Sequence, residues 1–208
     1  MLKCESLSFQ YTDGPSFSFP DIQCEQGEHL LLLGESGKGK TTLLHLLAGM
    51  LRPTQGSVTV ADTNIVGLRA KELDRFRGKH IGIIFQTAHF VQSLSVEDNL
   101  ILPQFFSGSK IDRAKAKAIL DRLNIGDKAK SKPKDLSIGE QQRAAIARAL
   151  VNDPDILLAD EPTSALDDKN AAEVIQLLEE QSSLSNAALI IVTHDQRLKD
   201  RFQKQVTL

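Results

Sequence analysis

The sequence predicts an α/β fold in which helices cover both faces of a mostly parallel sheet. Short apolar runs alternate with helical patterns at both ends of the 208-residue chain, and this alternation is typical of parallel sheets. Between residues 87 and 153 the strand patterns give way to helical ones. We therefore expect one domain over residues 1–208, with an α/β core from residues 1–86 and 154–208 and a helical subdomain from residues 87–153.

The first part of the chain alternates short strands with turns and helices. The run His29–Leu33 (HLLLL) is apolar throughout, as expected of a parallel strand buried on both faces. A glycine-rich turn and a helical run follow it. In this part the predicted strands are Leu2–Phe9, Phe17–Phe19, His29–Leu33, Ser57–Val60 and His80–Phe85, and the predicted helices are Thr41–Met50 and an exposed one at Lys71–Arg77.

Helical patterns dominate the insertion, and the α/β alternation returns after it. The insertion is predicted to hold helices at Ser95–Phe106, Ile111–Leu123 and Gly139–Asn152. The elements expected after it are a strand at Ile156–Ala159, a helix at Asp168–Gln181, a strand at Leu189–Thr193, a short helix at Gln196–Phe202 and an edge strand at Val206–Leu208.

The composition excludes several classes of protein. The net charge of −2 gives no basic excess, so we expect no direct nucleic-acid partner. Two cysteines make no disulfide framework and favour a reducing cytosol. No apolar run reaches the roughly 18–20 residues that cross a bilayer, and the N-terminus lacks the apolar stretch of a signal peptide. We expect a soluble chain without direct membrane insertion, which reaches a membrane only through a partner.

Residues Gly34–Thr41 (GESGKGKT) fit the pattern G-x-x-x-x-G-K-[ST] between a predicted strand and a predicted helix, which is the context that this motif requires. The glycines let backbone N–H groups turn inward around phosphate oxygens. Lys40 would then reach the β- and γ-phosphates, and the Thr41 hydroxyl would bind Mg²⁺. Lys38 is a further cation, which we expect to stay solvated. The alternative is a glycine-rich turn that only caps a helix, and the flanking elements favour nucleotide binding.

Residues Asp155–Pro162 (DILLADEP) form an apolar strand that ends in two acids. Asp160 at the strand end suits the Mg²⁺ position of a P-loop site. The neighbouring Glu161 could orient and deprotonate an attacking water. Two acids after a strand are common, and one of them could simply cap the next helix. Together with the P-loop, the catalytic interpretation is the better one.

The stretch Asp135–Leu150 (DLSIGEQQRAAIARAL) begins with a helix-start signal. Ser137, followed three residues later by Glu140, predicts a capping box in which each side chain bonds the backbone N–H of the other residue. A capped helix start leaves N–H groups and the positive end of the helix dipole available to an anion. The stretch therefore fits both a well-formed helix start and a phosphate site.

With its further motifs, the chain resembles the ATP-binding subunit of ABC (ATP-binding cassette) transporters. The resemblance covers nearly the whole chain, and the motifs occur in the order of the family. They are the P-loop, IGIIFQ ending at Gln86, the signature-like LSIGEQQRAAIARAL, ILLADEP, SALD at Ser164–Asp167, VTHD with His194, and Tyr11 where the family stacks an aromatic ring on adenine. Ile138 departs from the pattern, because the family usually has glycine there.

The resemblance implies a P-loop NTPase with a RecA-like, mostly parallel sheet core, an N-terminal antiparallel β subdomain and an inserted α-helical subdomain. It also implies that two copies close head to tail on two ATP molecules. The implied ATP contacts within one chain are Tyr11, Gly34, Glu35, Ser36, Gly37, Lys38, Gly39, Lys40, Thr41 and Thr42. The other implied roles are catalysis by Glu161 as general base with His194 and Gln86, Mg²⁺ binding by Thr41, Gln86 and Asp160, ATP contacts across the dimer by Ser137, Gly139 and Glu140, and communication across the interface by Asp167.

Several of these residues also have a plainer interpretation. A glutamine after a strand is usually a surface polar group, as Gln86 would be. His194 followed by Asp195 could begin a helix. Tyr11 could be ordinary strand packing, because the flanking TDGP is turn-like and could carry the ring away from the site.

Within the family, Arg77–Pro103 resembles the exporter ATPases of the lipoprotein-release and macrolide-efflux type. The resemblance to these exporter ATPases implies a partner besides the second copy of the chain, namely an integral membrane permease. It also implies a peripheral location on the cytoplasmic face of the cell membrane. Phe105 and Phe106 fit the core of the helical subdomain somewhat better than a permease contact. The candidates for that contact are Phe90, Val91, Leu94, Phe105 and Phe106.

Two other functions stay open on the sequence alone. A soluble ABC-type ATPase that acts on nucleic acid or ribosomes would usually bring coiled coils, a zinc insert or a second cassette, which the sequence lacks. A regulatory ATP-binding subunit without turnover would not need Glu161 and His194. We therefore expect a transport ATPase that uses ATP and Mg²⁺.

Overall fold

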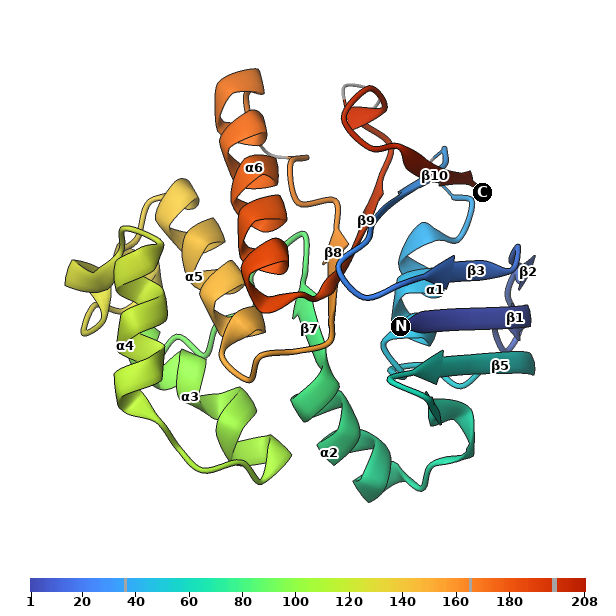
Figure 1. Ribbon diagram of the computed structural model, residues 1–208, viewed down its shortest axis with the longest axis horizontal. Coiled ribbons are helices and arrows are strands. Elements are labelled where there is room, and N and C mark those ends of the chain that lie inside the picture. Colours follow the sequence, from blue (N-terminus) through green and yellow to red (C-terminus); the bar gives the residue numbers. More distant parts are fainter. Residues whose placement is uncertain (36, 165, 196–197) are drawn as a thin grey trace.

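The computed structural model describes residues 1–35, 37–164, 166–195 and 198–208, which form two sheets with helices around them (Figure 1). One sheet is parallel throughout, which confirms the predicted α/β class. Its spatial order is β10 (Lys204–Thr207), β4 (His29–Leu33), β9 (Ala188–Thr193), β8 (Ile156–Asp160) and β7 (Ile81–Ile84).

The parallel sheet is buried on both faces because its strands carry apolar residues at successive positions. In β4, Leu31 and Leu33 belong to the core cluster under the helices. Leu30 and Leu32 point the other way, into a cluster that includes apolar residues of α1 (Lys40–Leu47) and of the second sheet. This explains why the strand reads as a continuous apolar run and not as an alternating one.

The second sheet is antiparallel, as the family resemblance implied. Its central strand is β1 (Leu2–Gln10), and the strands around it are β2 (Ser16–Ser18), β3 (Ile22–Cys24), β5 (Gln55–Val60) and β6 (Thr63–Asn64). The sequence analysis did not predict β3, because a strand of this length gives almost no periodic signal. Its paired register with β1 supplies the hydrogen bonds that define it.

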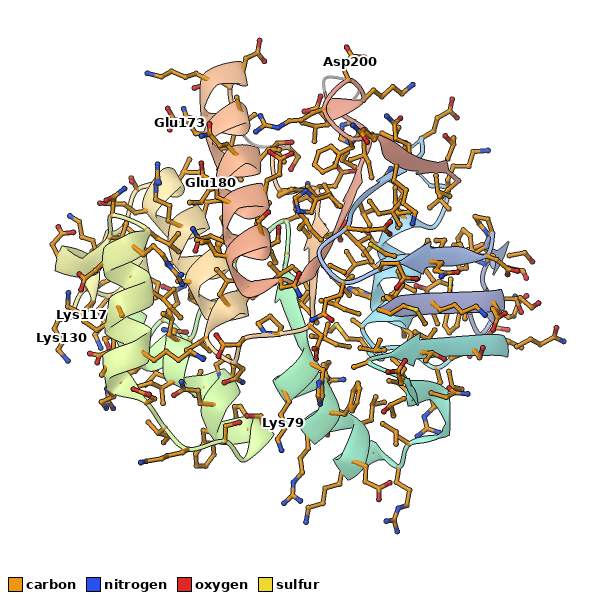
Figure 2. All side chains as sticks on the ribbon, in the orientation of Figure 1. Lys79, Lys117, Lys130, Glu173, Glu180 and Asp200 are labelled. Carbon is orange, nitrogen blue, oxygen red and sulfur yellow. The ribbon has the colours of Figure 1, made fainter. Side chains whose placement is uncertain are left out.

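Helices cover the parallel sheet on the side away from the antiparallel sheet, where α3, α4, α5 and α6 lie together (Figure 1). Figure 2 shows Glu173 on α6, and its carboxylate is 3.6 Å from the guanidinium of Arg143 on α5. The helix bounds are α2 (Ala70–His80), α3 (Val96–Ser107), α4 (Arg113–Arg122), α5 (Ile138–Leu150) and α6 (Asp168–Ser185), with short 3-10 turns at η1 (Ile65–Gly67), η2 (Gly126–Lys128) and η3 (Pro133–Asp135).

The expectation that Phe105 and Phe106 belong to the helical core is wrong. Their exposed fractions are 64% and 68%. Helix α3 buries Gln104 and Ser107 on one face, and an α-helix turns by about 100° per residue. The two phenylalanines between them therefore face solvent, where they meet each other edge to face.

The C-terminal strand differs slightly from its predicted bounds. The edge strand β10 begins two residues before its predicted start and pairs with β4. The helix predicted at Gln196–Phe202 falls partly outside the described residues. Within the part of the chain that the structure describes, no helix has the length and apolar character needed to cross a membrane.

Gly82 shows how closely α5 approaches the parallel sheet. A Cβ at this position in β7 would lie 2.5 Å from the carbonyl oxygen of Ala149 and 2.6 Å from Leu157 Cδ2. We expect Gly82→Ala to lower the free energy of unfolding by about 1–3 kcal/mol through overpacking. Chemical denaturation measures this change. Gly67→Ala is the matched control, because its Cβ would meet nothing within 4 Å. An equal stability of the two variants would contradict the packing argument.

Candidate active site

The carboxyl ends of three adjacent parallel strands meet at one cavity. The register pairs Leu33 of β4 with Thr193 of β9, and Val192 of β9 with Asp160 of β8. The loops that follow these strands therefore begin side by side, where ligands of such sheets bind. The cavity has a volume of about 740 Å³ and is lined by Phe17, Gly34, Glu35, Gly37, Gly39, Lys40, Thr41, Thr42, Gln86, Glu161 and His194.

The glycine-rich loop after β4 has the backbone of an anion-binding turn. Gly37 and Gly39 have φ angles of 84° and 85°, in the left-handed region that favours glycine. Gly39 caps α1, and no side chain bonds the first N–H groups of that helix. These donors are therefore available to a ligand. Ser36, a predicted contact, lies outside the described residues.

Lys40 lies inside this loop. Its ammonium donates to the carbonyl oxygens of Gly34 at 2.8 Å and Glu35 at 3.0 Å, and lies 3.6 Å from Glu161 Oε1. Its side chain is buried. Lys38, in contrast, is exposed, as predicted for a solvated cation. The loop therefore holds one buried cation where a phosphate oxygen would meet it.

Asp160 is a buried carboxylate with an unused oxygen. Among the groups that the structure describes, Oδ1 has no hydrogen-bond partner. Burial raises the pKa of this carboxyl, and the neighbouring charge of Glu161 adds to the effect, while a hydrogen bond with Thr41 opposes it. An unpaired buried carboxylate oxygen costs stability, so a bound cation would find an acceptor already desolvated here.

Glu161 is held from several sides by the end of β9. Its Oε2 accepts from Thr193 Oγ1 at 2.8 Å and from the backbone N–H of His194 at 3.3 Å. Its Oε1 lies 2.8 Å from His194 Nδ1. The φ angle of Glu161 is 46°, an unusual value for a residue with a side chain, and its N–H donates to Val192 at 2.8 Å. Such local strain often occurs where a side chain must be aimed.

Gln86 and Asp167 make contacts within the chain that fit their positions near this site. Gln86 Nε2 donates to Ser164 Oγ at 3.0 Å, which joins the loop after β7 to the loop after β8. Asp167 caps α6, and its Oδ1 accepts from Asn170 N at 2.9 Å. The hydrogen bonds that Asn170 donates to the Asp167 carboxylate lower the pKa of this group.

Tyr11 lies next to the cavity but is not part of its lining. Its hydroxyl is 3.0 Å from Thr42 Oγ1, and its ring packs edge to face on Phe9 at 4.7 Å and on Phe17 at 6.3 Å. The ring that lines the cavity is Phe17, which lies against Gly39. The sequence analysis treated Phe17 as a strand residue, since no local pattern distinguishes it. Thr193 was not predicted as a site residue either. The pattern that could have indicated it is a polar residue at the end of an apolar strand.

The predicted capping box at the start of α5 is confirmed. Ser137 Oγ accepts from Glu140 N at 3.3 Å, and Glu140 Oε2 accepts from Ser137 N at 2.8 Å. Ile138 is 67% exposed, and a Cβ on Gly139 would meet nothing within 4 Å. None of these residues lines the cavity. Within one chain, the structure does not bring the start of α5 together with the loop after β4.

Comparisons with known proteins agree with this geometry. A family profile described as ABC transporter matches residues 19–164. The lipoprotein-releasing system ATP-binding protein LolD of Chromohalobacter salexigens is 39% identical over 201 residues, covering 94% of this chain and 85% of that protein. The protein of the same name from Legionella pneumophila is 36% identical over 214 residues, covering 100% of this chain and 94% of that protein.

A solved structure has a very similar fold. It is described as the dimeric, post-hydrolysis state of the ATP-binding cassette MJ0796 bound to ADP and Pi. Its TM-score is 0.89 at 31% sequence identity, and the match covers 100% of this chain and 94% of that one.

We expect Asp160→Asn to raise the melting temperature of the nucleotide-free chain at neutral pH by a few degrees. The raised pKa of Asp160 means that the folded state holds its proton more tightly, so ionisation costs stability as pH rises. The amide removes this cost, and in a chain of this size each 1 kcal/mol of stability gained corresponds to about 2–4 °C in melting temperature. The gain should shrink toward pH 4, near the ordinary aspartate pKa of about 3.9.

Thermal melts at several pH values measure the effect. The control is Asp155→Asn, because Asp155 is half-buried and paired with His80 Nδ1 at 2.6 Å. That substitution removes a favourable partner and should give no gain in melting temperature. A lower melting temperature for Asp160→Asn at neutral pH would contradict the cost assigned to this carboxylate.

Proposed function

The chain belongs to the ABC transporter family, and from this premise we propose that it hydrolyses ATP to power an exporter of the lipoprotein-release type. The observation that carries the proposal is the meeting of the glycine-rich loop after β4 with Asp160 and Glu161 at the end of β8, on the two sides of β9. Relatives that match the chain over most of its length carry the lipoprotein-releasing name, which supports this subtype.

The glycine-rich loop binds the triphosphate of ATP. Backbone N–H groups of Gly34–Thr42 surround the phosphate oxygens, and the free N–H groups at the start of α1 add to them. Lys40 exchanges its carbonyl partners for the β- and γ-phosphates, to which a cation binds more strongly. Tyr11, with Phe17 beside it, offers an aromatic surface to adenine.

The residues around Asp160 fit a Mg²⁺ ion. The unpartnered Oδ1 of Asp160 supplies a desolvated acceptor, and Thr41 and Gln86 supply a hydroxyl and an amide oxygen. Oxygen ligands of this kind are what Mg²⁺ prefers, and nucleotide sites complete its shell with phosphate oxygens and water. When bound, Mg²⁺ neutralises negative charge that develops on the phosphates.

Glu161 acts as the general base of hydrolysis. Its carboxylate takes a proton from a water molecule as the water oxygen bonds to the γ-phosphorus and the bond to the leaving ADP oxygen breaks. Thr193 and the backbone of His194 fix the carboxylate in place. The exposed His194 side chain orients the water and the γ-phosphate from the open side of the cavity.

The start of α5 serves the ATP of a second copy. Ser137, Gly139 and Glu140 lie away from the cavity of their own chain, and the surface at Gly139 is open. Two copies that associate head to tail would bring each start of α5 onto the γ-phosphate of the other. Asp167, at the start of α6, lies on the loop that follows Glu161 and communicates across the same interface.

The second partner is a permease in the cell membrane, and the chain binds to its cytoplasmic face. Residues 87–153 form a helical subdomain beside the core of residues 1–86 and 154–208. This subdomain carries the exposed Val91, Phe105 and Phe106, which supports a protein contact near Gln86. ATP closes the pair of copies, and hydrolysis reopens it.

We expect Glu161→Gln to reduce ATP turnover by at least a hundredfold while ATP binding and the ATP-dependent dimer persist. The amide cannot accept the proton, whereas the loop that binds the phosphates is unchanged. Phosphate release and light scattering with ATP measure the two properties. Turnover close to that of the wild type would remove Glu161 from its proposed role.

We expect Gly139→Val to lose the ATP-dependent dimer while the single chain keeps its melting temperature. A valine meets no atom of its own chain within 4 Å of Cβ, so the effect must arise from the second copy. Ile138→Gly is the companion variant and should keep or raise ATPase activity, because Ile138 is exposed. Gly139→Val that dimerises with ATP would refute the proposed role of this surface.

A further inference from the structure

Thr193 is the last residue of β9, and its side chain is fully buried. Its Oγ1 accepts from the backbone N–H of Asp195 at 3.0 Å and donates to Glu161 Oε2 at 2.8 Å. A hydroxyl carries a single proton, so the proton of Thr193 is committed to the Glu161 carboxylate. The branched Cβ of threonine also restricts χ1, and with it the direction of the hydroxyl. Thr193 therefore offers Glu161 a hydrogen-bond donor of fixed direction.

The two oxygens of the Glu161 carboxylate contact groups of different kinds. Oε2 accepts from the fully buried Thr193 hydroxyl and, at 3.3 Å, from the backbone N–H of His194. Oε1 lies 2.8 Å from His194 Nδ1 and 3.6 Å from Lys40 Nζ. Lys40 and His194 line the cavity, whereas Thr193 is not part of its lining. A ligand in the cavity can therefore reach the partners of Oε1, but not the hydroxyl that holds Oε2.

We propose that Thr193 is a positioning residue that holds Oε2 of Glu161, so that Oε1 is the oxygen that takes the proton from the attacking water. The proposal deepens the proposed function and rests on it. The phosphates of ATP draw Lys40 and the His194 side chain toward themselves, which uncovers Oε1. Thr193 keeps its hydrogen bond to Oε2 throughout, because its hydroxyl is buried at the end of a strand.

This fixed hydrogen bond matters because the last torsion of a glutamate side chain is broad and roughly two-fold, so a carboxylate without a partner turns easily. In the reaction, the water oxygen bonds to the γ-phosphorus, its proton moves to Oε1, and the bond to the ADP oxygen breaks. Thr193 forms no bond to these reacting atoms. It limits the rotation of the base, and a misplacement of about 1 Å can cost on the order of a hundredfold in rate.

We expect Thr193→Val to lower kcat by about ten- to a hundredfold while KM and the affinity for ATP stay the same. Valine has nearly the shape of threonine but cannot donate to Oε2, and the glycine-rich loop that binds the phosphates is untouched. Thr193→Ser keeps the hydroxyl and should restore kcat to within about threefold of the wild type. Phosphate release over a range of ATP concentrations, together with equilibrium ATP binding, measures these quantities.

Ser182→Ala is the matched control for the loss of a buried hydroxyl. Ser182 on α6 is fully buried like Thr193, and its Oγ also has two partners, because it donates to Glu179 O at 3.0 Å and lies 3.0 Å from His29 Nε2. None of these three residues lines the catalytic cavity. Ser182→Ala should therefore keep the kcat of the wild type, even if its melting temperature falls.

A double variant tests whether Thr193 acts through Glu161. If it does, Thr193→Val combined with Glu161→Gln should turn over ATP as slowly as Glu161→Gln alone, because a base that is absent cannot be misplaced further. Independent effects would multiply instead, and such a result would overturn the proposal. Thr193→Ala removes the same donor with a smaller side chain, and it replaces the valine variant in both comparisons if valine disturbs the fold.

The outcomes separate this proposal from the proposed function. If the wild-type chain releases no phosphate from ATP, the proposed function fails and the role of Thr193 fails with it. If the wild type hydrolyses ATP, Glu161→Gln does not, and Thr193→Val keeps the kcat of the wild type, then the positioning role is refuted and the proposed function stands. A loss of kcat that Thr193→Ser does not restore, or that Ser182→Ala shares, would also refute it.

Discussion

The chemistry of this protein depends on the parallel register of three strands. Because β4, β9 and β8 are adjacent and run in one direction, the loops after them begin at the same edge of the sheet. The end of β4 leads into the glycine-rich loop and Lys40, the end of β8 carries Asp160 and Glu161, and the end of β9 carries Thr193 and His194. A shift of one residue would turn every side chain of a strand to the opposite face. Close packing of side chains of different size and shape in the cores on the two faces of the sheet opposes that shift.

Holding these charges together is costly, and the structure reduces the cost with internal hydrogen-bond partners. Lys40 uses the carbonyl oxygens of its own loop, and Glu161 uses Thr193 and the backbone of His194. Among these charged groups of the site, Asp160 keeps a buried oxygen, Oδ1, without a hydrogen-bond partner in the described chain. ATP and Mg²⁺ would replace these internal partners, and their binding to the folded chain would stabilise it.

The site residues that could be predicted from the sequence are those that belong to a short local motif. The P-loop, Asp160, Glu161 and the capping box at Ser137 depend on spacings within a few residues, and those spacings can be read directly. Phe17, Thr193 and the exposure of Phe105 depend on which elements meet in space. The strand β3 has only three residues, Ile22–Cys24, which is too short to show a periodic pattern. Tertiary packing, which one sequence does not display, decides each of these.

Cysteine crosslinking tests most directly whether the start of α5 in one copy closes on the phosphate loop of another. Lys38→Cys and Ile138→Cys place thiols at two exposed sites, each in a Glu161→Gln chain to prevent turnover. The native Cys4 and Cys24 are buried, and burial raises the pKa of each thiol to about 11, so they should not compete. We expect a short bismaleimide crosslink only when both variants are mixed and ATP is present. A crosslink that forms equally without ATP, or its absence with ATP, would contradict it.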